Sequence, residues 1–126
     1  MRILLIEDNP ANLKLARLLL ERQGYTVLHA DNARDGLAMA QCQAPDLILM
    51  DIQLPGMDGL EATRRLKADP ATASIRVVAL TAFAMPGDEA RMREAGCDGY
   101  IAKPIQYRDF LDEVARRLAE PRSTPS

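Results

Sequence analysis

The sequence predicts an α/β fold of the doubly wound kind, with a five-stranded parallel sheet and helices on both of its faces. Short apolar runs alternate with longer amphipathic stretches five times along the 126 residues, and no internal repeat is visible. Such alternation implies right-handed crossovers between parallel strands. The length suits a single domain, because a second hydrophobic core would not fit.

The predicted strands are short apolar runs bounded by polar or turn-forming residues, as expected for strands that are buried on both faces. Two adjacent valines, Val77 and Val78, strengthen the prediction of the fourth strand. The five strands are expected at residues 3–6, 25–30, 47–51, 75–80 and 99–102.

The helices are predicted from caps, breakers and the spacing of apolar side chains. Asn9 offers an N-cap with Pro10 at the first helical position, and Gly24 ends this helix. Asn32 caps a second helix that runs to about residue 43. The other helices are expected at 59–68, from 86 or 87 to 96, and over an i, i+3, i+4, i+7 series of apolar side chains: Tyr107, Phe110, Leu111, Val114 and Leu118.

Composition and charge exclude several classes of function. The formal net charge of -2 gives no basic footprint for nucleic acid, and the apolar runs are too short to span a membrane. The chain begins with a strand pattern rather than a signal peptide, so we expect a cytoplasmic protein. Cys42 and Cys97 lack CxxC spacing and His29 is the one histidine, so we expect two reduced, packed thiols and no zinc site.

Polar residues follow the predicted strands where a ligand of an open α/β sheet would bind, beyond the carboxyl ends. Glu7 and Asp8 follow the first strand, Asp51 ends the third, Thr81 follows the fourth and Lys103 follows the fifth. Three carboxylates, a hydroxyl and an ammonium are therefore expected at one edge of the sheet.

These groups suit a metal ion and a phosphoryl group. At about 4 Å and an effective dielectric constant near 20, each pair of carboxylates repels by roughly 4 kcal/mol, and a divalent cation among them removes that cost. Oxygen ligands without a nearby His or Cys favour Mg²⁺, with Mn²⁺ as a substitute, over zinc. Thr81 and Lys103 are the groups that would hold phosphate oxygens.

Four blocks of the sequence resemble the signature blocks of the two-component response regulator receiver domain: LLIEDN, LILMDIQLPGMDG, VVALTA and YIAKPI. The longer blocks MDIQLPGMDGLE and TAFAMPGDEARMREAGCDGYIAKPI are further similar to single-domain, DivK-type regulators of polar differentiation and the cell cycle, and to receiver modules of hybrid histidine kinases. The resemblance implies a flavodoxin-like (CheY-like) sheet in the order 2-1-3-4-5. It also implies a receiver domain at 1–119, and the segment EPRSTPS at 120–126 is predicted to be a disordered tail.

The resemblance implies that Asp51 is the phosphoacceptor and that Mg²⁺ is held by Asp8, Asp51 and the backbone carbonyl of Gln53. Glu7 would act on the ion through a bound water. The family usually has two aspartates after the first strand, and here Glu7 replaces the first of them with its charge kept.

By the same resemblance, Asp51 would attack the phosphorus of a phosphohistidine or a small phosphodonor. Thr81 would bind a phosphoryl oxygen, and Lys103 would pair with the phosphoryl charge. Movement of Thr81 towards that group would vacate space for Tyr100, the switch aromatic. The Lys103–Pro104 step matches one whose peptide bond is typically cis in this family.

The resemblance also implies partners. A histidine kinase or a histidine phosphotransfer protein would approach the first helix and the lysine–proline loop, and a downstream protein would bind the face around the fourth helix, fifth strand and fifth helix. The protein would be a single-domain regulator rather than a turnover enzyme, and a monomer, with a dimer left open. Candidate contacts for the kinase are Asn9, Pro10, Asn12, Leu13 and Pro104.

Other interpretations stay open on the residues alone. Thr81 could be an ordinary strand residue, Lys103 a solvated lysine and Asp58 part of a solvated face. A haloacid-dehalogenase-type phosphatase would need an aspartate where Gln53 stands, and a flavodoxin-like electron carrier would need Ser, Thr and Gly where EDNPAN stands. The chain could also be a docking module without phosphorylation. A last hypothesis concerns Phe83, whose bulk would shield an acyl phosphate from water and slow its hydrolysis.

Overall fold

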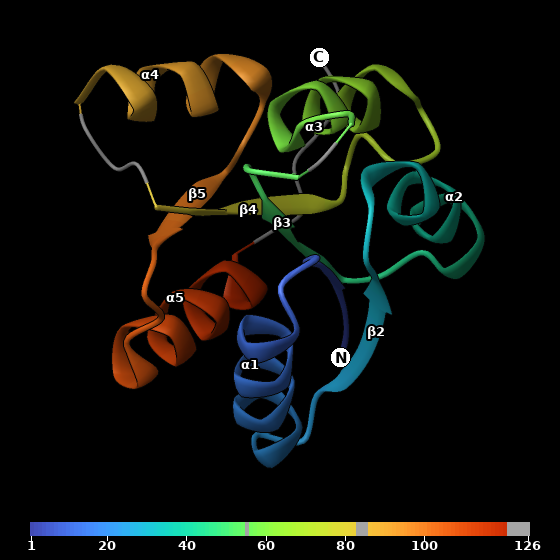
Figure 1. Cartoon of the computed structure of the whole chain (residues 1–126). Coiled ribbons are helices and arrows are strands. Elements are labelled where there is room, and N and C mark those ends of the chain that lie inside the picture. The colour runs from blue at the N-terminus through green and yellow to red at the C-terminus, as the bar shows by residue number, and fades with distance from the viewer. Residues whose placement is uncertain (55, 83–85, 121–126) are drawn as a thin grey trace.

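Five parallel strands form one sheet in the computed structural model, which describes residues 1–54, 56–82 and 86–120 (Figure 1). Their order is β2-β1-β3-β4-β5, which confirms the expected order. β4 is one residue later in the chain than predicted, so Thr81 pairs within the sheet, with Ala102, instead of following it. The strands are β1 (Arg2–Ile6), β2 (Thr26–Ala30), β3 (Leu47–Asp51), β4 (Arg76–Thr81) and β5 (Gly99–Ala102).

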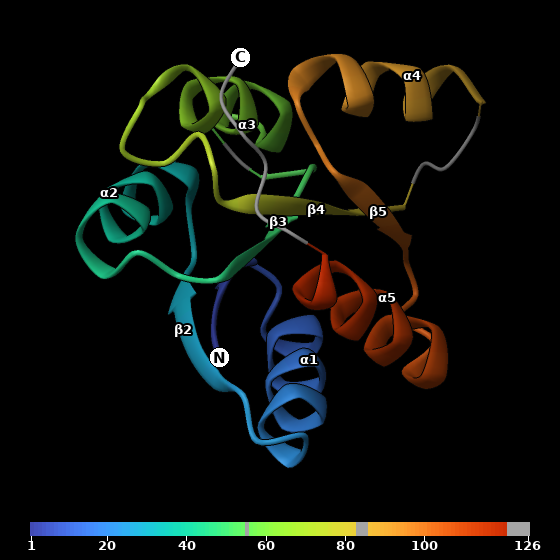
Figure 2. The ribbon, with the colours of Figure 1, turned by 180° about the vertical axis from the view of Figure 1, so that it is seen from behind.

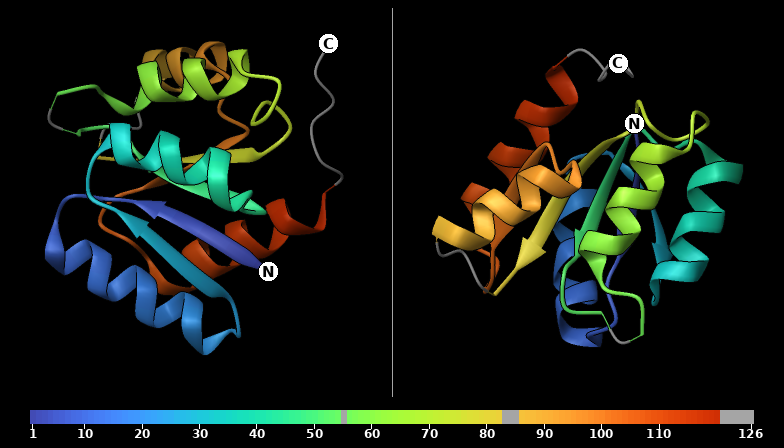
Figure 3. Two further views of the ribbon diagram at one scale, coloured as in Figure 1. Left: turned by 90° about the vertical axis from the view of Figure 1, so that its right-hand side faces the viewer. Right: turned by 90° about the horizontal axis from the view of Figure 1, so that it is seen from above.

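Helices cover both faces of this sheet, as predicted. Two pack on one face and three on the other, a division that is clear from the side in Figure 3 and from behind in Figure 2. The first pair is α1 (Pro10–Arg22) and α5 (Tyr107–Ala119), and the other three are α2 (Ala33–Gln43), α3 (Gly59–Ala68) and α4 (Pro86–Ala95).

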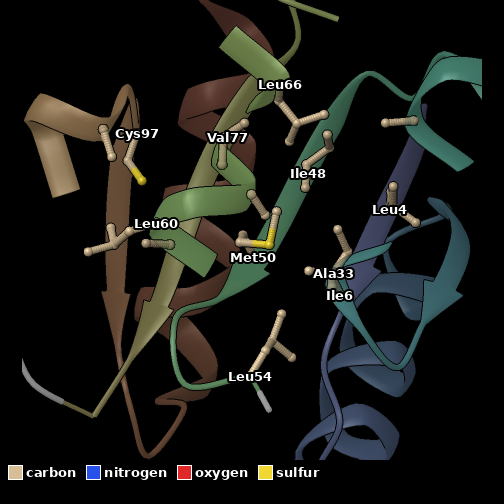
Figure 4. Close-up of a cluster of buried hydrophobic side chains, with 14 of the residues drawn as sticks. Leu4, Ile6, Ala33, Ile48, Met50, Leu54, Leu60, Leu66, Val77 and Cys97 are labelled. Atoms are coloured by element: carbon tan, nitrogen blue, oxygen red, sulfur yellow. The ribbon is translucent and has the colours of Figure 1, made fainter. Parts of the chain in front are cut away.

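Alternate residues of the central strands point into two separate hydrophobic cores. Ile3 and Leu5 of β1 pack with α1 and α5, whereas Leu4 and Ile6 pack with α2, α3 and α4. Figure 4 shows the second core, in which Leu66 of α3 lies over the side chains of the strands. Because β1, β3 and β4 are covered on both faces, all of their residues are apolar except at the strand ends, where Arg2, Asp51, Arg76 and Thr81 stand.

The predicted caps and breakers start and stop the helices. Asn9 Oδ1 accepts hydrogen bonds from the backbone amides of Ala11 and Asn12, at 2.9 and 3.1 Å, and Asn32 caps α2 in the same way. Gly24 follows α1 with a φ of 88°, a conformation that costs glycine little.

Cys42 differs from the expectation, and Asp58 has a structural role beyond the one expected. Cys42 is exposed, so the prediction of two packed thiols is wrong for it; position 42 lies across α2 from the buried Ala40. Both Cys42 and Cys97 are free thiols, as expected. Asp58 is exposed, as expected of a solvated face, but it is also the N-cap of α3, since its Oδ1 accepts from the Glu61 amide at 2.9 Å.

Some predictions fall on other parts of the chain. Phe83 and, from residue 121, the predicted tail lie outside the described residues. Within residues 1–54, 56–82 and 86–120, no helix is long and apolar enough to cross a membrane.

The register of the sheet brings the carboxyl ends of four strands to one edge. Met50 pairs with Ile6 on one side and with Ala79 on the other, and Ala79 pairs with Tyr100. The residues that follow these positions therefore lie close together beyond the carboxyl ends of the strands. This is where an open α/β sheet binds its ligands.

Candidate functional site

Three carboxylates gather at this edge. Glu7 and Asp8 follow β1, Asp51 ends the neighbouring β3, and each residue offers an oxygen within 4.8 Å of the others. Glu7 and Asp51 are 1% and 2% exposed, whereas Asp8 is open to solvent. Like charges this close repel strongly where water is excluded, so the cluster favours a cation or a bound proton.

The ammonium of Lys103 supplies positive charge to this cluster. Its Nζ lies 3.1 Å from Glu7 Oε2 and 3.1 Å from Asp51 Oδ1. The Lys103 amide donates to the Thr81 carbonyl at 2.7 Å, which extends the pairing of β4 with β5 and aims the side chain at the acids. The alternative of a solvated lysine is wrong, because the side chain is 14% exposed and paired with two carboxylates.

Glu7 is held in place through its backbone and its side chain. Its amide donates to the Ala30 carbonyl at 3.1 Å, and its Oε1 accepts from the Asn9 amide at 3.1 Å. The ring of His29 donates from Nε2 to the Glu7 carbonyl at 3.0 Å. Sequence reasoning gave His29 no role; the parallel register that pairs Leu5 with His29 is the signal that could have found this contact.

Burial, and then a hydrogen bond with Asp51, raise the pKa of Glu7 to about 7, although the Asn9 amide and the Lys103 ammonium oppose the change. Oε2 of Glu7 is buried and accepts no hydrogen bond within the described ranges, even though Lys103 lies at ion-pair distance. The cluster therefore contains a buried oxygen that a proton or a cation would satisfy.

Asp51 is fixed by hydrogen bonds of the backbone that follows it. Its Oδ1 accepts from the Gln53 amide at 3.0 Å, and the Ile52 amide donates to the Leu80 carbonyl at 3.0 Å. The amide of Gly59, the first residue of α3, donates to the Ile52 carbonyl at 3.2 Å. The loop after β3 is thus tied to β4 and to α3, which holds the carboxylate at the edge of the sheet.

Thr81 is 2% exposed and lies beside a side chain that sequence reasoning did not place. Gln53 Nε2 donates to Thr81 Oγ1 at 3.4 Å, and Gln53 Oε1 accepts from the Ala82 amide at 3.4 Å. The carboxamide of Gln53 therefore connects the loop after β3 with the end of β4. Only the side-chain conformation reveals this connection, so no sequence signal could have predicted it.

The other predicted residues lie around this cluster. Tyr100 of β5 is half-buried against the core under α2, α3 and α4, and it borders a cavity of about 400 Å³ between α4, β5 and α5. The peptide bond between Lys103 and Pro104 is cis, as the resemblance implied. Asn9, Pro10 and Pro104 are exposed beside the acids and Lys103, whereas Asn12 and Leu13 are half-buried one turn into α1.

Comparison with known proteins agrees with this geometry. A family model described as the response regulator receiver domain matches residues 3–115. The polar-differentiation response regulator DivK of Brucella anthropi is 46% identical over 118 residues, which cover 94% of this chain and 96% of that protein. DivK of Brucella ovis is 45% identical over 118 residues, which again cover 94% of this chain and 96% of that protein.

Solved structures give the same result for the fold. A putative response regulator from Chloroflexus aurantiacus superposes with a TM-score of 0.90 at 28% identity, covering 94% of this chain and 98% of that one. The receiver domain of a sensor histidine kinase from Pseudomonas aeruginosa superposes with a TM-score of 0.87 at 34% identity and with the same coverage. That structure is described with a magnesium ion coordinated in its active-site cleft. The chemotaxis regulator CheY4 of Vibrio cholerae shares the fold, with a TM-score of 0.87 at 24% identity. The match covers 92% of this chain and 97% of that one.

Proposed function

This chain belongs to the response regulator receiver domain family, and on that premise we propose that it accepts a phosphoryl group on Asp51 from a histidine kinase or a phosphotransfer protein. It then signals through contacts with other proteins that depend on phosphorylation. The observation that carries the proposal is the buried Asp51 carboxylate, 3.1 Å from the Lys103 ammonium and grouped with Glu7 and Asp8.

The donor set fits Mg²⁺, and Mn²⁺ as its substitute. The buried Glu7 Oε2 has no hydrogen bond among the described residues, and the three acids offer only oxygen ligands, which these ions prefer. Asp8, Asp51 and the backbone carbonyl of Gln53 would hold the ion, with Glu7 acting through a bound water. When bound, the ion neutralises charge on carboxylate and phosphoryl oxygens.

The transfer itself needs a nucleophile and charge compensation. An Asp51 oxygen attacks the phosphorus of a phosphohistidine, the bond from phosphorus to nitrogen breaks, and the imidazole leaves with that electron pair. The product is an acyl phosphate on Asp51. Lys103, already 3.1 Å from Asp51 Oδ1, pairs with the phosphoryl charge, so catalysis is mostly positioning and electrostatics.

The phosphorylated state is read through Thr81 and Tyr100. The phosphoryl oxygens are new acceptors for the buried Thr81 hydroxyl, and its movement frees space for the half-buried Tyr100 ring. The change reaches the face of α4, β5 and α5, to which we assign a downstream protein. The kinase or phosphotransfer protein docks on Asn9, Pro10, Asn12, Leu13 and Pro104. The names of the relatives support a role in polarity or cell-cycle control.

Intact mass after incubation with acetyl phosphate and Mg²⁺ tests the proposal. We expect the wild type to gain one phosphoryl group that is labile to base, and Asp51→Asn to gain none. Asp112→Asn, an exposed aspartate on α5, is the matched control and should be phosphorylated as the wild type is. A wild type that gains nothing, or an Asp51→Asn variant that still gains the group, would contradict the proposal.

A further inference from the structure

The backbone carbonyl of Glu7 is held by a side chain instead of by the ladder of the sheet. The Glu7 amide continues the pairing of β1 with β2, since it donates to the Ala30 carbonyl at 3.1 Å, and a regular parallel ladder would go on with the Asn32 amide. Asn32 is instead the N-cap of α2, and no backbone amide of the described ranges donates to the Glu7 carbonyl. The His29 ring takes that place, with Nε2 3.0 Å from the oxygen. Because a carbonyl oxygen only accepts, Nε2 carries the hydrogen.

This hydrogen bond acts on the peptide unit that joins two of the three acids. The Glu7 carbonyl and the Asp8 amide lie in one rigid plane, so a donor that fixes the carbonyl also fixes the direction in which the chain enters Asp8. The Asp8 side chain is exposed and makes no hydrogen bond or ion pair with the residues that the structure describes. On its other side, the Asn9 amide donates to Glu7 Oε1 at 3.1 Å. The position of the Asp8 carboxylate therefore depends on how the neighbouring backbone is held.

We propose that His29 is a positioning residue of the metal site, which holds the peptide between Glu7 and Asp8 in the orientation that keeps the Asp8 carboxylate with the other acids. The inference rests on the proposed function, in which Asp8 is a ligand of Mg²⁺, and it adds a residue from a strand that supplies no ligand. Mg²⁺ demands nearly ideal octahedral geometry, so a ligand that is free to turn lowers the affinity. Groups that orient metal ligands typically contribute about tenfold to a hundredfold to metal affinity.

The ring lies outside both hydrophobic cores, so its role in the site can be tested apart from the fold. His29 is half-buried on β2, an edge strand, and belongs to neither core. It borders a cavity of about 430 Å³, which three exposed residues also line: Asp31, Asp35 and Ala38. Substitution of the ring therefore leaves the packing of the two cores intact, and a weaker metal affinity is distinguishable from a loss of folded protein.

Calorimetric titration with Mg²⁺ tests the inference on substituted proteins that circular dichroism shows to be folded. We expect His29→Leu, which removes the donor, to bind Mg²⁺ roughly tenfold more weakly than the wild type. His29→Asn should be equally weak, because its amide nitrogen is placed like Nδ1 and does not reach the carbonyl. His29→Gln carries a donor near the position of Nε2 and should restore most of the affinity. Met39→Leu, on the wall of the same cavity, is the control and should bind as the wild type does.

A second readout needs neither a metal ion nor a substitution. His29 is the one histidine of the chain, so its ring nitrogens give unambiguous nitrogen–proton NMR signals. The hydrogen of the neutral ring should lie on Nε2, and a hydrogen on Nδ1 overturns the inference. A His29→Leu variant that binds Mg²⁺ as tightly as the wild type overturns it too, as does a His29→Gln variant that binds as weakly as His29→Leu. These three results leave the proposed function standing, whereas a wild type that binds no Mg²⁺ overturns the proposed metal site and the positioning role with it.

Discussion

A methyl group on Gly59 would lie 2.3 Å from the carbonyl oxygen of Asp51, so the first residue of α3 packs directly on the backbone of the central carboxylate. The atoms in the way belong to the main chain of Asp51 and Ile52, which cannot rotate aside as the end of a side chain can. The backbone position of Asp51 therefore depends on the absence of a side chain at residue 59.

Gly59→Ala should lower the free energy of unfolding by roughly 1–3 kcal/mol, because the added methyl forces α3 and the end of β3 apart. Urea unfolding followed by circular dichroism measures the change. Gly87→Ala is the matched control: its methyl would meet nothing within 4 Å, and alanine favours the helix by up to about 1 kcal/mol. If both variants were equally stable, the contact between Gly59 and Asp51 would not constrain the fold.

Glu7 makes the stability of the metal-free protein depend on pH. Its pKa is about 7 in the folded chain against 4.5 for the free group, so its contribution to stability is fully present below about 4.5 and is lost as the pH rises through about 7. We expect the metal-free wild type to lose up to about 3 kcal/mol of unfolding free energy over this window. Glu7→Gln, which cannot titrate, should lose much less. Urea titrations at pH 5 and pH 8 give the comparison.

The proton that the Glu7 carboxyl binds below about pH 7 competes with Mg²⁺ for the site. The apparent affinity for Mg²⁺ should rise with pH up to about 7 and level off above it, since the ion binds the carboxylate form. The slope should approach tenfold per pH unit below that value if one proton is displaced. Calorimetric titration with Mg²⁺ between pH 5.5 and 8.5 measures it, and the Glu7→Gln variant should show a flatter profile. A wild-type profile with no slope would mean that Glu7 is ionised throughout this range.

Lys103→Met should separate metal binding from phosphoryl transfer. The ammonium contacts the same carboxylates that would hold Mg²⁺, so its removal should tighten Mg²⁺ binding by roughly tenfold while phosphorylation by acetyl phosphate slows by at least as much. Calorimetry gives the first quantity and intact-mass time courses the second. Lys14→Met, on the exposed face of α1, should change neither. Parallel loss of both properties would show that Lys103 supports the acids only structurally.

Arg76 holds the end of α5 to the opposite edge of the sheet. Its guanidinium is buried and donates to the carbonyls of Leu118, at 3.1 Å, Asp46, at 3.2 Å, and Glu120. Arg76→Met should cost roughly 2–4 kcal/mol of unfolding free energy, because buried carbonyls lose their donors. Arg76→Lys should restore little, since one ammonium cannot span the three acceptors. Arg108→Met, exposed on α5, should be near neutral in the same urea titration.

The sheet and the position of Asp51 follow from periodicity, because buried parallel strands have an apolar signature and their carboxyl ends share an edge. The convergence of Asp51, Thr81 and Lys103 was predictable for that reason. So were the caps at Asn9 and Asn32, which depend on a few neighbouring residues only.

The contacts that sequence reasoning missed all depend on how a side chain is directed in three dimensions. Nothing local to Gln53 indicates that it turns towards Thr81, and nothing local to Arg76 indicates that its acceptors lie at the end of α5. The support of Glu7 by His29 needs the strand register as well as the sequence. The exposure of Cys42 follows from the rotation of α2 about its axis, which small apolar residues on both sides leave unspecified.

The four strands that meet at the site are drawn from almost the full length of the chain, so an unfolded or half-folded molecule does not hold the complete site. A cation that binds there recognises the native state alone. Each tenfold excess of free cation over its dissociation constant then adds about 1.4 kcal/mol to the folded state. The resistance of this protein to proteolysis should consequently rise with the concentration of free divalent cation, with no change in its sequence or its partners.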